Sequence, residues 1–70
     1  MDRIAVESSN LKSAGYDPES QVLEVEFSSG SVYQYTDVPA SVYRELLDAD
    51  SKGSYFNAHI RVAYSFTRVA

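Results

Sequence analysis

The residues in this sequence that are suited to ligand chemistry lie near its end. Residues 51–68, "SKGSYFNAHIRVAYSFTR", interleave aromatic side chains with basic ones and contain no acid. The candidate nucleic-acid-binding residues of this segment are Lys52, Tyr55, Asn57, His59, Arg61, Tyr64 and Arg68. Aromatic rings stack on exposed bases and cations neutralise phosphates, so this mixture is typical of single-stranded RNA recognition. The same composition would also serve simply to fill a small core and keep the chain in solution.

The sequence contains few residues that are suited to catalysis. His59 is the only histidine and cysteine is absent, so a nucleophile and its base would have to be an ordinary serine and His59. A surface histidine beside Arg61 is the simpler interpretation. Glu24 and Glu26 would lie about 7 Å apart on one strand face, where the alternating pattern favours a solvated face and no third metal ligand is near in sequence. We therefore expect no catalysis, no metal and no cofactor.

The charge of the chain is unevenly distributed along its length. Residues 1–50 hold all ten acids and three of the bases, whereas residues 51–70 hold three bases and no acid, within a net charge of −4. Three cations can contact only a few phosphates. Any RNA binding by this segment is therefore predicted to be weak and sensitive to salt.

Length and composition limit the class of protein. Seventy residues, 44% of them hydrophobic, predict one compact domain over residues 1–70. The lack of cysteine excludes disulfides and thiolate zinc sites. No stretch approaches the length of a membrane span, and the first residues lack the pattern of a secretory signal. We expect a cytoplasmic location and no membrane partner.

Two alternating runs predict a β-hairpin at the centre of the fold. "VLEVEF" at 22–27 alternates apolar with acidic residues and predicts a strand over 21–27, and "SVYQYT" at 31–36 alternates again. If residues 28–30 form the loop, Tyr33 and Tyr35 share the apolar face; a loop one residue shorter places them beside the glutamates. A glycine in the last loop position favours the three-residue loop. The tyrosine rings are then mostly buried, with hydroxyls at a polar partner or at the rim.

The remaining elements are predicted from the spacing of apolar residues and from the residues that begin and end helices. "NLKSAGYD" at 10–17 predicts a weaker strand, which completes a meander of three. "DVPASVYRELLDADSKG" switches to a spacing of three and four and predicts a helix over 38–51, with Asp37 as its cap, Pro39 in its first turn and Gly53 at its end. This helix is expected to cover the two tyrosines.

Three further segments complete the predicted fold. "SYFNAHI" predicts a short second helical turn capped by Ser54, and "VAYSFTRV" predicts a final strand over 62–69. "RIAVES" is a candidate partner for that strand. The predicted fold class is α+β, a small antiparallel sheet made of the meander plus the terminal strand pairing, with one main and one short helix packed on one face.

Four stretches of the sequence together resemble a known family. They are "SSNLKSAGYDPES", "LEVEFSSGSVYQYTDVP", "VYRELLDADSKGSYFN" and "IRVAY", and they closely resemble the KTSC domain over about residues 6–69. That domain is found as a free-standing small bacterial protein and at the C-terminus of some lysyl-tRNA synthetases. The positions singled out by the family pattern are Tyr33, Tyr35, Gly53, Phe56, Asn57, Ile60 and Arg61. The resemblance implies no catalytic residues, and its link to a tRNA synthetase suggests RNA as the partner.

Two functions are therefore open from sequence. The first is a non-catalytic module that binds tRNA or single-stranded RNA through the basic aromatic segment, with Lys52, Arg61 and Arg68 on phosphates. The second is a protein-interaction module, such as a homodimer, that uses sheet edges and surface tyrosines. Whether the three cations converge on one face decides between them.

Overall fold

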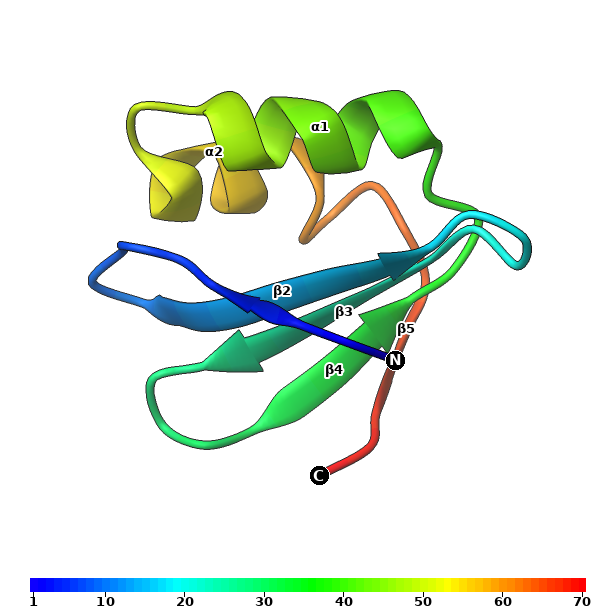
Figure 1. The fold of residues 1–70 in the computed structure, drawn as a ribbon, viewed down its shortest axis with the longest axis horizontal. Coiled ribbons are helices and arrows are strands. Elements are labelled where there is room, and N and C mark those ends of the chain that lie inside the picture. Colours follow the sequence, from blue (N-terminus) through cyan, green and yellow to red (C-terminus); the bar gives the residue numbers. More distant parts are fainter.

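The fold has two layers, a five-stranded antiparallel sheet and two helices that cover one of its faces (Figure 1). The computed structural model describes residues 1–70. Its elements are β1 Ile4–Ala5, β2 Leu11–Asp17, β3 Val22–Phe27, β4 Val32–Tyr35, α1 Ala40–Asp48, α2 Lys52–His59 and β5 Phe66–Arg68. The strands lie in the order β1-β2-β3-β4-β5, so each pairs with its neighbours in sequence. The α+β fold class is confirmed.

The β3–β4 hairpin has the register that the three-residue loop predicts. Leu23 pairs with Tyr35 and Val25 pairs with Tyr33. The Phe27 amide donates to the Ser31 carbonyl at 2.9 Å, and Gly30 closes the loop with a φ of 97° that favours glycine. Both tyrosines consequently leave the sheet on the side of the helices.

The first helix is shorter than predicted at both ends. The residue before a proline disfavours helical backbone, and the amide of buried Val38 donates to the Gln21 carbonyl, outside the helix. Pro39 is therefore the N-cap, and the prediction that Asp37 caps the helix is wrong, because Asp37 has a left-handed φ of 58° in the preceding turn. The helix ends at the extended backbone of Ala49, well before Gly53.

The second helix begins earlier than predicted. Its cap is Ser51, whose hydroxyl oxygen accepts from the Ser54 amide at 3.3 Å, so the assignment of Ser54 as the cap is wrong. Gly53, expected to end the first helix, is instead a buried residue inside α2. The main helix and the short second helix of the predicted fold are both present, but their boundaries lie elsewhere in the chain.

The terminal strands lie on opposite edges of the sheet and do not pair with each other. β1 pairs with β2 and β5 pairs with β4, because the central meander separates them. β5 is also shorter than the predicted 62–69: fully buried Ile60 holds the chain in the helical layer, so residues 61–64 turn back before pairing starts. Val62 is 82% exposed in this turn.

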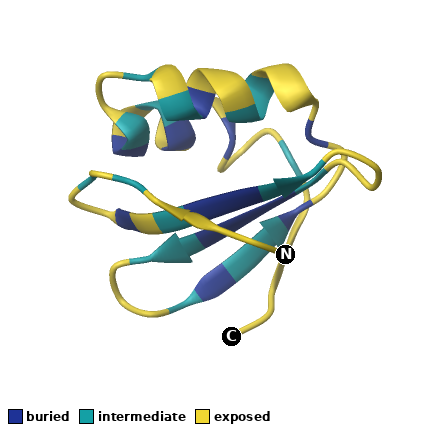
Figure 2. Cartoon of the chain, viewed as in Figure 1, coloured by how far each residue is buried: buried dark blue, intermediate teal, exposed yellow.

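The core lies between the sheet and the helices. Figure 2 shows the buried residues along the central strands and on the parts of the helices that face them. The core cluster is Leu11, Ala14, Leu23, Val25, Tyr35, Val38, Leu46, Phe56 and Ile60. No helix is long and apolar enough to span a bilayer.

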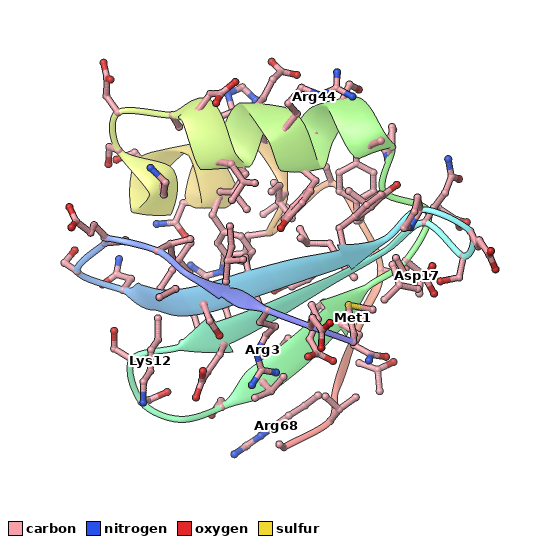
Figure 3. All side chains as sticks on the ribbon, viewed as in Figure 1. Met1, Arg3, Lys12, Asp17, Arg44 and Arg68 are labelled. Carbon is pink, nitrogen blue, oxygen red and sulfur yellow. The ribbon has the colours of Figure 1, made fainter.

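The other face of the sheet carries a polar network and is not simply solvated. Glu24 is only 8% exposed; its carboxylate accepts from Arg3 Nη1 at 2.6 Å and from Gln34 Nε2 at 2.9 Å. Glu26 accepts from the Ser13 hydroxyl at 2.8 Å. The Gln34 hydrogen bond, helped by Arg3, lowers the pKa of Glu24 against the opposing effect of burial. Arg3 thereby fastens the N-terminal segment across the sheet (Figure 3).

Candidate ligand-binding groove

Five aromatic rings form a continuous cluster on the helix-facing side of the sheet. They are Phe27, Tyr33, Tyr35, Phe56 and Phe66, and each neighbouring pair has ring centroids 5.4 to 5.6 Å apart. Strand alternation places Tyr33 and Tyr35 on this face, and the β4–β5 pairing brings Phe66 opposite Tyr35. Phe56 reaches the cluster from α2. Three strands and one helix therefore build a single aromatic surface.

An open cavity of about 770 Å³ lies over these rings, and we call it the aromatic groove. It is framed by the loop before β2, the β3–β4 loop, α2 and the chain that follows α2. Besides the five rings and Val62, its lining consists of Ser9, Asn10, Ser28, Ser29, Ser31, Asn57 and Arg61. The floor is aromatic and the rim is rich in hydroxyl and amide groups, as in sites that orient a ligand by a few polar contacts.

The rings differ in what they offer to a ligand. Tyr35 and Phe56 are 3% and 2% exposed and form the floor, whereas Phe66 is 56% exposed. The Tyr35 hydroxyl makes no hydrogen bond within the protein. Every buried side-chain nitrogen or oxygen in the protein has a hydrogen-bond partner, so this hydroxyl is not buried and reaches solvent. Burial, reinforced by Tyr33 and opposed by Arg61, raises the pKa of Tyr35. The sequence predicted that the tyrosine hydroxyls lie either at a polar partner or at the rim, and they lie at the rim.

Arg61 is the only charged residue that lines the groove. The ion pairs of the protein are both made by Arg3, so the Arg61 guanidinium has no acidic partner. The Ile60 and Arg61 amides both donate to the Phe56 carbonyl, at 3.0 and 2.9 Å, which fixes the backbone of Arg61 at the end of α2. An unpaired cation in a groove without acids favours an anionic ligand.

Gly53 sets how closely α2 approaches the opposite rim. A Cβ at Gly53 would lie 3.3 Å from Ser8 Oγ and 3.5 Å from Asn10 Nδ2, a contact tighter than most. Ser8 Oγ in turn accepts from the Asn10 and Leu11 amides, at 3.3 and 3.4 Å. Asn57 lies one helical turn after Gly53 and so on the same side of α2. The absence of a side chain at Gly53 therefore brings Asn57 to the groove beside Asn10.

Two of the seven residues that the sequence nominated for binding line the groove, namely Asn57 and Arg61. The rings of Tyr55 and exposed His59 contact each other on α2 in a tilted arrangement, with centroids 4.6 Å apart, and both Tyr55 and Tyr64 pack partly buried against the core. Lys52 Nζ donates to the Ala49 carbonyl at 3.1 Å, and Arg68 Nε donates to the Ala70 carbonyl at 2.9 Å.

The cations of the segment 51–70 do not converge on the groove. Lys52 begins α2 and Arg61 follows its C-cap Ile60, so the rest of the helix separates them. Arg68 pairs opposite Tyr33 but its guanidinium lies outside the groove lining. Figure 3 shows Arg68 at the far end of the molecule from Arg44 on α1. This scatter removes the three-cation phosphate surface on which the first sequence hypothesis was based, so any RNA binding must depend on the aromatic rings and on Arg61 alone.

The groove also contains residues that the binding prediction missed, chiefly Phe27, Tyr33, Phe66 and Asn10. One signal in the sequence could have found part of it. Five of the seven positions singled out by the family pattern line the groove, and Gly53 and Ile60 position α2 behind it. No group of three or more histidine, cysteine or acidic side chains is placed to hold a metal ion.

Comparison with known proteins gives consistent matches. The family model described as the KTSC domain matches residues 7–64. An uncharacterized protein of Stutzerimonas stutzeri is 60% identical over 57 residues, which cover 81% of this chain and 80% of that protein. The lysine–tRNA ligase of Nostoc punctiforme is 42% identical over 64 residues, or 91% of this chain, but the chain spans only 11% of that ligase.

A solved structure gives the same result for the fold. The crystal structure of a KTSC domain protein from Yersinia pestis superposes with a TM-score of 0.96 at 33% sequence identity. The match covers 99% of this chain and 97% of the other.

Proposed function

This chain belongs to the KTSC domain family, and we propose that it is a non-catalytic module that binds a short single-stranded segment of RNA in the aromatic groove. One observation carries the proposal: the groove combines the exposed ring of Phe66 with the unpaired guanidinium of Arg61 and contains no acid. A relative named for its tRNA substrate makes RNA the nucleic acid to test first.

The geometry supports a particular mode of binding. A base stacked on an aromatic ring contributes about 1–3 kcal/mol, and Arg61 can pair with a phosphate through two parallel hydrogen bonds. The side chains of Asn10 and Asn57 supply donors and acceptors for a base edge. Elsewhere the net charge of −4 disfavours contact with the phosphate backbone. Binding is therefore confined to the groove and to unpaired bases.

The test is a fluorescence-anisotropy titration with a labelled single-stranded RNA, a duplex of the same sequence and tRNA, across a salt series. We expect single strands to bind more tightly than the duplex. One phosphate contact on a single strand gives a slope of about −0.7 in log affinity against log salt. Arg61→Gln should weaken binding several-fold and bring the slope close to zero.

Arg44→Gln is the matched control, because Arg44 is exposed on α1 and lies outside the groove (Figure 3). It removes the same charge and should leave affinity unchanged. Absence of binding at low salt, or equal weakening by both substitutions, would contradict the proposal.

The alternative function is protein interaction through a sheet edge, for example as a homodimer. It is favoured by the open outer edge of β5, where Phe66 in the strand and Val69 directly after it are 56% and 48% exposed. Light scattering tests it directly. A dimer that is lost on Val69→Lys would support this alternative, whereas a monomer at all concentrations would count against self-association.

A further inference from the structure

We infer that the minimal ligand of the aromatic groove is a single nucleotide, with its base on the exposed ring of Phe66 and its phosphate on Arg61. The inference rests on the proposed function and deepens it, because it states how many nucleotides of an RNA strand the groove binds. Two independent features of the groove, its charge and its exposed ring surface, lead to the same size of ligand, and its polar rim supplies hydrogen-bonding groups for that ligand.

The charge of the groove matches one phosphate. Arg61 is exposed, has no ion pair and is the only charged lining residue. The other cations of the segment, Lys52 and Arg68, donate to backbone carbonyls outside the groove lining. A second phosphate in the groove would therefore be left without a counter-charge.

The ring surface matches one base. Tyr35 and Phe56 are buried, so their faces are covered by protein and cannot receive a base. Phe66 is 56% exposed, and its tyrosine neighbours meet it at 48° and 40°, tilted away from face-to-face stacking. The groove thus offers one widely exposed ring, flanked by the half-buried Tyr33.

The polar rim supplies groups for the base edge and the sugar. Neither the Asn57 nor the Asn10 side-chain amide makes a hydrogen bond within the protein, and each has two donors and an acceptor to offer. The hydroxyls of Ser9 and Ser31 lie on the same lining. The cavity of about 770 Å³ is within the usual size range for a small-molecule ligand.

The experiment is a titration of the isotope-labelled protein with adenosine 5′-monophosphate, adenosine and inorganic phosphate, followed by ¹H–¹⁵N spectra. We expect the monophosphate to shift the amides of groove residues and to compete with labelled single-stranded RNA. Adenosine or phosphate alone should bind at least about tenfold more weakly, which corresponds to about 1.4 kcal/mol.

Variants assign the two halves of the ligand to their contacts. Arg61→Gln should reduce the affinity for the monophosphate to that for adenosine, and Phe66→Leu should reduce it to that for inorganic phosphate. Val69→Ala is the control, since Val69 is exposed near the same sheet edge but outside the groove. Spectra of each variant without ligand show whether it is folded.

The outcomes separate this inference from the proposed function. If single-stranded RNA binds but the monophosphate neither shifts groove amides nor competes, the one-nucleotide inference is wrong and the proposed function stands. If neither ligand binds, both fail. Shifts confined to the polar face around Glu24 would also overturn the inference, because they would place the nucleotide on the wrong side of the sheet.

Discussion

The substitution Gly15→Ala tests how the N-terminal segment is fastened to the sheet. A Cβ at Gly15 would lie 2.3 Å from the Asp2 carbonyl oxygen and 3.0 Å from Arg3 Cγ. The first contact is with backbone, which cannot rotate away as a side chain can. The segment that holds Asp2 and Arg3 must therefore move off the sheet in the variant.

The cost follows from the contacts that this movement breaks. The Arg3–Glu24 ion pair, at 2.6 Å and partly exposed, contributes up to about 1 kcal/mol. The hydrogen bonds between the N-terminal segment and β2 are lost as well, among them that of the Val6 amide to the Lys12 carbonyl at 3.1 Å. We expect Gly15→Ala to lower the free energy of unfolding by about 1–3 kcal/mol, the usual range for a forced overlap.

Urea unfolding followed by circular dichroism measures this cost, and amide exchange at Val6 reports release of the segment. Gly53→Ala is the matched control, because its Cβ meets the Ser8 hydroxyl at 3.3 Å and a helical alanine gains up to about 1 kcal/mol over glycine. Its net effect should lie within about 1 kcal/mol of zero. The double variant with Arg3→Ala should cost less than the sum of the single changes.

Two results would refute this reasoning about the N-terminal segment. One is a Gly15→Ala variant as stable as the parent with Val6 still protected from exchange. The other is full additivity with Arg3→Ala, which would mean that the overlap is relieved without moving Arg3.

Two further predictions concern polar groups outside the groove. The pKa of Glu24 is lowered from its ordinary value of 4.5 by the Gln34 hydrogen bond, so its stabilising contribution is complete above that value and is lost as the pH falls through the folded-state pKa. Glu24→Gln should therefore flatten the acid side of a profile of unfolding free energy against pH. An unchanged slope would mean that other carboxyl groups cause the loss of stability at low pH. The Tyr16 hydroxyl donates to the carbonyl of buried Val38, so Tyr16→Phe should cost about 1–3 kcal/mol in urea unfolding. Tyr33→Phe, which removes a hydroxyl without a protein partner, should cost less than about 0.5 kcal/mol; equal costs would show that the Val38 contact is unimportant.

Local sequence was sufficient for the hairpin and insufficient for the helix boundaries. Alternation and the position of Gly30 determine the register that places Tyr35 in the core, and both act within a few residues. Ser51 and Ser54 are equally good caps by local criteria. The choice of Ser51 goes with the contact of Gly53 against Ser8, which is 45 residues earlier in the chain and carries no local signal.

The groove was only partly predictable for the same reason. Asn57 and Arg61 were nominated because they lie in an acid-free aromatic segment, and both are in the lining. The remaining lining comes from segments that meet only in the folded chain, such as Asn10 before β2 and Phe27 at the end of β3. Charge counting along the sequence overestimated the cationic surface, because it could not show that Lys52 and Arg68 lie apart from Arg61.

The most direct test of the central claim is a chemical-shift map of the assigned protein with a short single-stranded RNA. The account predicts that the largest shifts fall on the groove residues Tyr33, Asn57, Arg61 and Phe66, with little change around Glu24 on the opposite face. Shifts centred on Lys52, Tyr55 and His59, or on the open face of the sheet, would contradict the account.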